Sequence, residues 1–141
     1  MNRTPGDEAL PADVLKAVID RLVDVLAPEA LYLFGSAAEG RLRLDSDVDL
    51  AVLVNAPIAP AQRWALTAQL ADLVRRDVDL VDLRRASTVF QALVVSRGHR
   101  LWVGDASAVA WFEMRALKSY ALLNEERAPI LERMQREGSP F

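Results

Sequence analysis

The chain has 141 residues, of which 52% are hydrophobic and 26% charged, a composition typical of one globular domain with its own core. The absence of cysteine excludes disulfides and thiolate metal sites. A net charge of −3, from 17 basic and 20 acidic residues, argues against broad nucleic-acid binding, which needs a basic face. Residues 1–9 lack the apolar segment of a secretory signal, and no apolar run approaches the length of a membrane span. We therefore expect a soluble cytoplasmic protein that binds neither nucleic acid directly nor a membrane.

Hydrophobic periodicity and turn signals predict alternating helices and strands. In chain order these are a helix from Pro11 to Pro28, strands at 30–34 and 48–54, a helix at 60–76, a strand at 78–83, a helix capped by Ser87 or Thr88 that ends near Gly98, a strand at 99–103, and a last helix from Asp105 or Ser107 to about Asn124, with Pro129 kinking it or starting a final one. This order predicts an α/β (α+β) fold, a small mixed sheet with helices on at least one face and a long C-terminal helix. We expect one domain over residues 10–137, with flexible ends at 1–9 and 138–141.

Two aspartates mark the start of the second strand, in the sequence Asp47-Val48-Asp49-Leu50. Residues two apart in a strand point to the same side, so both carboxylates project together. Like charges this close repel each other unless a cation lies between them. Because all the donors are oxygen atoms, the pattern favours Mg²⁺, or Mn²⁺, over zinc.

A Gly-Ser pair, Gly35-Ser36, ends the first strand. Glycine lets the backbone turn tightly and approach a ligand, and Ser36 adds a hydroxyl. If residues 36–39 form a helical turn, their free N–H groups favour an anion such as a nucleoside triphosphate. Arg41 and Arg43, in the arm that follows, could reach its phosphates.

A third carboxylate, Asp79, lies in the strand at 78–83. It could help to hold the ion or accept a proton from an attacking hydroxyl. Asp77, at the strand entrance, and Asp82, which a regular strand would point the opposite way, compete for this role.

Taken singly, each of these features is more often structural than functional. A Gly-Ser pair is usually a turn, and an exposed strand aspartate is usually only solvated. Trp64, Trp102 and Trp111 are most simply core or half-buried packing residues. The apolar residues of the last helix fall on more than one face, which leaves open a partner or self-association surface.

The combined pattern resembles a known family. Gly35-Ser36 through Gly40, followed by Ser46-Asp47-Val48-Asp49-Leu50, is similar to the signature of the DNA polymerase β-like nucleotidyltransferase superfamily. The short length and the segment Val78–Val81 resemble its minimal nucleotidyltransferase (MNT) branch. The C-terminal half, with Gly98–Trp102 and Phe112–Arg115, is similar to MNT-type antitoxins of HEPN/MNT toxin–antitoxin pairs.

This resemblance implies a reaction. Asp47, Asp49 and Asp79 would hold one or two magnesium ions, and Ser36 with the Gly35 backbone would bind the triphosphate of ATP. A tyrosine hydroxyl of a cognate HEPN RNase toxin would attack the α-phosphate, so that AMP is attached to the toxin and neutralises it within a toxin–antitoxin complex.

Two alternatives remain open at this point. The chain could be an antitoxin that neutralises its toxin by complex formation alone, or a nucleotidyltransferase acting on a small molecule. The second alternative ranks last because those enzymes usually carry an added acceptor-binding domain, for which 141 residues leave little room.

Overall fold

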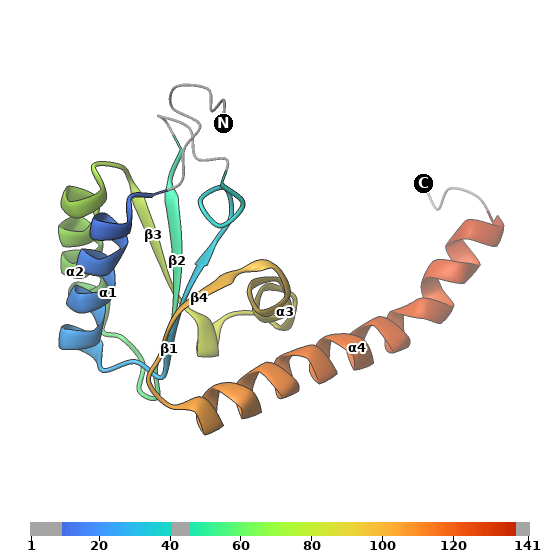
Figure 1. Cartoon of the computed structure of the whole chain (residues 1–141). Helices are drawn as coiled ribbons and strands as arrows, with labels where there is room; N and C mark the ends of the chain where they lie inside the picture. Colours follow the sequence, from blue (N-terminus) through green and yellow to red (C-terminus); the bar gives the residue numbers. More distant parts are fainter. Residues whose placement is uncertain (1–9, 41–45, 138–141) are drawn as a thin grey trace.

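The computed structural model describes residues 10–40 and 46–137, with only the backbone described from 127 onward. Figure 1 shows a four-stranded sheet between two pairs of helices, and a long last helix that extends away from the sheet. The elements are α1 (Ala12–Leu26), β1 (Ala30–Phe34), β2 (Val48–Leu53), α2 (Pro60–Val74), β3 (Val78–Asp82), a 3-10 turn η1 (Leu83–Arg85), α3 (Thr88–Arg97), β4 (His99–Val103) and α4 (Ala106–Glu137). The predicted α/β fold with a mixed sheet is confirmed.

The strands lie in the order β3-β2-β1-β4. β1 is antiparallel to both β2 and β4, whereas β2 and β3 are parallel. A parallel pair needs a crossover connection, and α2 supplies it between β2 and β3. β3 and β4 therefore form the two edges of the sheet.

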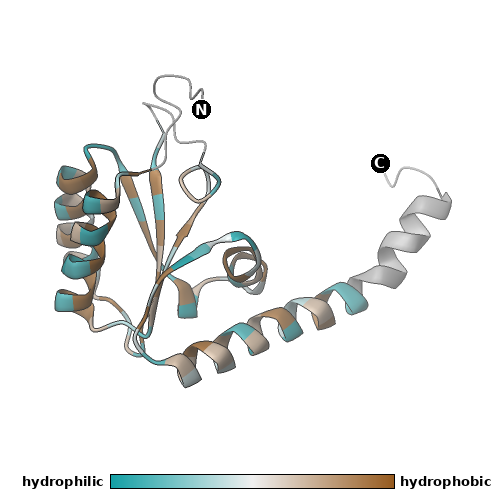
Figure 2. Cartoon of the chain, viewed as in Figure 1, coloured by the Kyte–Doolittle hydropathy of each residue, from teal (hydrophilic) through white to brown (hydrophobic). Residues whose placement is uncertain are grey.

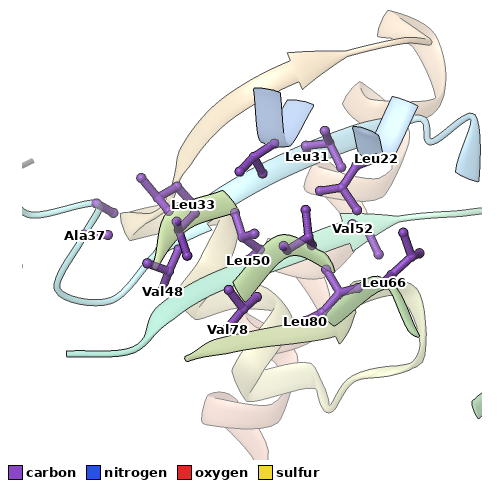
Figure 3. Packing of buried hydrophobic residues seen from close by; sticks show 14 of the residues in the cluster. Leu22, Leu31, Leu33, Ala37, Val48, Leu50, Val52, Leu66, Val78 and Leu80 are labelled. Carbon is purple, nitrogen blue, oxygen red and sulfur yellow. The ribbon is translucent and has the colours of Figure 1, made fainter. Parts of the chain in front are cut away.

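Alternation along the strands gives the sheet two apolar faces. One face packs against α1 and α2, which contribute Leu22 and Leu66 among others (Figure 3). The opposite face, which includes Tyr32 and Leu53, packs against α3 and the first turns of α4. Helices thus cover both faces, which explains why the central strands β1 and β2 read as nearly continuous apolar runs.

Local capping signals set the helix starts. The Ser87 hydroxyl accepts a hydrogen bond from the Phe90 N–H at 3.1 Å, and the Asp105 carboxylate accepts one from the Ala108 N–H at 3.1 Å. Of the two caps that the sequence allows at each position, Ser87 and Asp105 are therefore the ones used.

α4 is longer than the sequence indicated. It continues to Glu137, so the prediction of an end near Asn124 is wrong, and Pro129 does not start a separate helix. A proline removes one backbone hydrogen bond without having to end a helix, and the ribbon bends in its last part (Figure 1). Val109, Phe112 and Ala116 anchor its beginning, and the Tyr32 hydroxyl donates a 2.7 Å hydrogen bond to Glu113. Figure 2 shows that apolar residues continue along α4 beyond this anchored part.

Two of the three tryptophans are not packing residues, which corrects the prediction made for them. Trp64 is 81% exposed and Trp111 is 64% exposed, whereas Trp102 is 37% exposed. Trp64 is not on the face of α2 that carries the core residues Leu66 and Leu70 but on the neighbouring face of the helix, beside the edge of the sheet. No helix in the described part of the chain has the apolar length needed to cross a membrane.

Candidate active site

Strand pairing brings two of the predicted carboxylates together. Asp49 of β2 pairs with Phe34 of β1 on one side and with Asp79 of β3 on the other. Paired residues on neighbouring strands point to the same face, so Asp49 and Asp79 project side by side. Asp47 lies just before β2 and is exposed. Residues 30 positions apart in the sequence thus meet at one end of the sheet, where β1 ends and β2 and β3 begin.

Gly35, which directly follows β1, lets the Asp49 carboxylate lie close to the backbone. Gly35 has a φ of 70°, which L side chains rarely adopt, and a Cβ at this position would collide with Oδ2 of Asp49. The Asp49 carboxylate therefore lies directly against the Gly35 backbone. Only glycine lets the turn and the carboxylate approach this closely.

The segment after Gly35 forms one helical turn, which meets the condition set above for binding an anion. The Glu39 N–H donates to the Gly35 carbonyl at 3.2 Å, and the Gly40 N–H donates to the Ala37 carbonyl at 3.3 Å. Ala37 and Ala38 are buried in the core, which holds the turn in place. Its first N–H groups, including that of Ser36, make no recorded backbone hydrogen bond to another described residue, so they remain available to an anion.

The electrostatics of the site centre on Asp49. Burial raises the pKa of its carboxyl, and the negative charges of Asp79 and then Asp47 raise this pKa further. The site therefore carries negative charge that the described residues do not neutralise. In the described part of the chain, no three His, Cys, Asp or Glu side chains converge closely enough to form a ready-made ligand set for an ion. The donor chemistry nevertheless fits a hard cation such as Mg²⁺, because all three groups are carboxylates and their repulsion would be relieved by a positive charge.

Of the three aspartates that compete for the third position, Asp79 is best placed. Asp82 forms an ion pair with Arg85 at 3.1 Å and pairs in register with Val52, three positions along β2 from Asp49. Asp77 precedes β3, and its carbonyl accepts the Val48 N–H at 2.9 Å. Neither affects the Asp49 carboxyl as Asp79 does. Arg41 and Arg43, predicted as phosphate ligands, lie outside the described residues.

Sequence reasoning missed a groove next to these carboxylates. It has a volume of about 600 Å³ and lies between one face of α2 and the first half of β3. Arg63, Trp64, Thr67 and Ala71 line it from α2 at helical spacing, and Asp79 lies at its β3 side. The available signal was this second, partly polar stripe on α2, which the apolar periodicity of the helix obscured.

The fold agrees with comparisons to known proteins. Residues 16–107 match the family described as Polymerase beta, Nucleotidyltransferase. Protein adenylyltransferase MntA from Shewanella oneidensis (strain MR-1) is 39% identical over 104 residues, which are 74% of this chain and 74% of the relative.

Solved structures of toxin–antitoxin complexes are also similar. A crystal structure of a toxin–antitoxin with AMP-PNP matches with a TM-score of 0.72 and 36% identity, over 85% of this chain and 98% of the other. The MntA–HepT toxin–antitoxin matches with a TM-score of 0.72 and 33% identity, over 89% and 99%. A tri-AMPylated HEPN toxin from Shewanella oneidensis in complex with MNT antitoxin matches with a TM-score of 0.70 and 34% identity, over 86% and 96%.

Proposed function

This chain belongs to the polymerase β nucleotidyltransferase family, and on that premise we propose that it is an antitoxin that transfers AMP from ATP to a hydroxyl group of a HEPN toxin. The relative at 39% identity is a protein adenylyltransferase, and one solved relative is an antitoxin in complex with a tri-AMPylated HEPN toxin. The acceptor we propose is a tyrosine of the cognate toxin, which the modification neutralises. We place the reaction in the cytoplasm, where ATP is supplied.

A single observation carries the proposal, namely the register that pairs Asp49 with Asp79 beside the Gly35 backbone. A surface aspartate pair would be solvated and would need no glycine next to it. Here burial and two neighbouring carboxylates raise the pKa of Asp49, so the arrangement costs stability unless a cation is bound. Such an unfavourable cluster is typical of a functional site.

The residues have separate roles in this proposal. Asp47, Asp49 and Asp79 would hold Mg²⁺, or Mn²⁺, which neutralises charge on the triphosphate when it is bound. The Ser36 hydroxyl and the N–H groups of the turn after Gly35 would bind the phosphates of ATP. In the arm that follows, Arg41 and Arg43 would add charge-assisted hydrogen bonds to them.

The group transfer itself is a displacement at phosphorus. The acceptor oxygen forms a bond to the α-phosphate, and the bond between the α-phosphorus and the oxygen that bridges to the β-phosphate breaks, so that pyrophosphate leaves. The hydroxyl proton passes to a carboxylate, for which Asp79 is the proposed base because it lies on the outer side of Asp49. ATP and the acceptor protein are thus converted into AMP–protein and pyrophosphate.

Intact-mass spectrometry of the cognate HEPN toxin, incubated with this protein, ATP and Mg²⁺, tests the proposal. We expect the toxin to gain the mass of one or more AMP units and to lose RNase activity. The Asp47→Asn/Asp49→Asn double variant should reduce the transfer rate by at least about 100-fold, since both changes remove charge from the proposed metal site. Asp82→Asn is the matched control, because Asp82 pairs with Arg85 away from the site. Undiminished transfer by the double variant would refute the site assignment.

A second function is favoured by the exposed apolar residues of α4. Trp111, Met114, Leu117 and Leu122 are all exposed on this helix. Such residues are typical of a protein interface, so the chain could also neutralise a toxin by covering it. The same double variant separates the two functions, because neutralisation by complex formation alone would survive the loss of both aspartates and would require a stoichiometric amount of antitoxin.

A further inference from the structure

The groove beside Asp79 has an open strand edge as one wall. β3 is the edge strand next to β2, and residues 77–80 line the groove opposite α2. The Val48 N–H donates to the Asp77 carbonyl, so the backbone groups of Asp77 and Asp79 are the ones that point toward β2 in this parallel pair. Alternate residues of a parallel strand bond to opposite sides, so the N–H and carbonyl groups of Val78 and Leu80 point away from β2. Among the described residues, no backbone hydrogen bond is recorded that occupies this outer edge.

The opposite wall of the groove is a helix face with an exposed aromatic anchor. Trp64 is 81% exposed although it is one of the largest apolar side chains in the chain, and it lies one turn before Thr67 and Ala68 on the same face. An open strand edge opposite a helix is the geometry in which proteins bind an extended peptide as an added strand. The backbone groups of β3 would supply hydrogen bonds, and Trp64 would contact an apolar side chain of the peptide.

The lining and the position of the groove argue against a nucleotide as its occupant. Side chains alternate along a strand, so Val78 and Leu80 face the groove from β3, whereas Asp79 projects with Asp49 to the opposite face of the sheet. An uncharged peptide segment fits this apolar wall. The proposed nucleotide position, at Gly35 and Ser36, is separated from the groove by β2, because β1 is the next strand in the order.

The register of an added strand has a direct consequence for the reaction. A residue that pairs with Asp79 across the edge would point to the same face of the sheet as Asp79 and Asp49. The Asp79 N–H and carbonyl point toward β2, so in an antiparallel addition this would be a non-hydrogen-bonded pair, in which side chains are closest. A hydroxyl carried at that position would therefore lie beside the proposed base.

We propose that an extended segment of the acceptor protein binds as a fifth strand along β3, in the groove lined by Trp64, and that its register presents the acceptor hydroxyl to Asp79. This inference rests on the proposed function, since it assigns the acceptor site of that reaction. It makes the edge strand and α2, rather than the sheet faces, the surface that selects the acceptor.

Hydrogen exchange tests the strand addition without any catalysis. We expect the amides of Val78 and Leu80 to become protected when the unmodified cognate HEPN toxin is added in the absence of ATP. If the two proteins bind and these amides exchange as fast as before, this inference fails while the proposed function can still hold. If the proteins do not bind at all, the proposed function fails as well.

Steady-state kinetics of AMP transfer test the role of Trp64. Trp64→Ala should raise the KM for the toxin by roughly 10- to 100-fold, the range for an interface tryptophan, and leave kcat and the affinity for ATP nearly unchanged. Val25→Ala is the matched control, since Val25 is also an exposed apolar helix residue but lies on α1, outside the groove. Both variants should fold, because both side chains are exposed. An effect of Trp64→Ala on KM that is no larger than that of Val25→Ala would overturn the assignment.

Discussion

Replacing Gly35 by alanine tests the contact on which the site depends. The new Cβ would collide with Oδ2 of Asp49, so the carboxylate has to move away from its place against the Gly35 backbone. Gly40 provides a matched control at the other end of the same turn. Its φ is 69° against 70° for Gly35, but a Cβ there would meet nothing within 4 Å. The two alanine variants therefore share the backbone strain and differ in the collision.

The expected magnitudes follow from this difference. Alanine in the left-handed region costs about 1–2 kcal/mol relative to glycine, so both variants should lose about 3–8 °C in Tm for a chain of this length. The collision adds little to that cost, because the atom displaced is the end of a side chain rather than backbone. Moving a catalytic group by about 1 Å can reduce the rate on the order of 100-fold. Gly35→Ala should therefore lose AMP transfer to that extent, whereas Gly40→Ala should keep most of it.

Two measurements on each variant decide the matter. Thermal unfolding gives the change in stability, and intact-mass spectrometry of the HEPN toxin with ATP and Mg²⁺ gives the initial rate of transfer. Equal loss of transfer in both variants would show that the shape of the turn matters, not the contact with Asp49. Full activity of Gly35→Ala would show that the position of the Asp49 carboxylate is not needed for the reaction.

Three further outcomes are expected. Asp49→Asn should raise the Tm of the metal-free protein at neutral pH by up to about 4 °C, corresponding to about 1 kcal/mol. The substitution removes an ionised carboxyl group whose pKa is raised by burial and by the charges of Asp79 and Asp47. A carboxyl whose pKa is raised in the folded protein contributes its full stability below the unfolded pKa of 3.8, and this contribution is lost as the pH rises through the folded pKa. The gain in Tm of Asp49→Asn should therefore vanish when thermal unfolding is measured near pH 3.8. A gain in Tm that persists at this pH would contradict the electrostatic cause. Mg²⁺ should raise the Tm of the wild type but not that of the Asp47→Asn/Asp49→Asn variant, and an equal rise in both, measured in parallel, would place the ion elsewhere. Tyr32→Phe should lower the free energy of unfolding by about 1–2 kcal/mol, measured by denaturant unfolding, because it removes the hydrogen bond from a buried hydroxyl to the Glu113 carboxylate. The variant should leave AMP transfer unchanged. A loss of transfer without a loss of stability would give Tyr32 a role in the site.

The hydrogen bond between Tyr32 and Glu113 also shows how the long helix is held. Burial, and then the Glu113 carboxylate, raise the pKa of the Tyr32 hydroxyl, so it stays protonated and donates. Oε2 of Glu113 also lies 3.6 Å from Nε of Arg100, on β4. These polar contacts join the start of α4 to the sheet on the face that carries Asp49. The same helix then continues away from the domain with apolar residues exposed, as a surface for a large partner requires (Figure 2).

The local features of this protein could be predicted from its residues alone. Helix and strand positions followed from apolar periodicity, and each of two helix starts was narrowed to two candidate caps, because both signals act between residues a few positions apart. The pairing of Asp47 with Asp49 and the turn at Gly35-Ser36 were likewise readable, since the spacing along one strand or turn decides them.

Features that depend on which segments become neighbours could be established only from the folded chain. Asp79 is distinguished from Asp77 and Asp82 by the register of β3 against β2, which no local pattern encodes. The exposure of Trp64 depends on which face of α2 packs on the sheet, and the open groove depends on β3 being an edge strand. In the same way, only the folded chain shows that Gly35 is required by the Asp49 carboxylate lying against it. Such long-range contacts arise from the packing of the whole domain, so the sequence could name the candidate carboxylates but could not place them or the surface beside them.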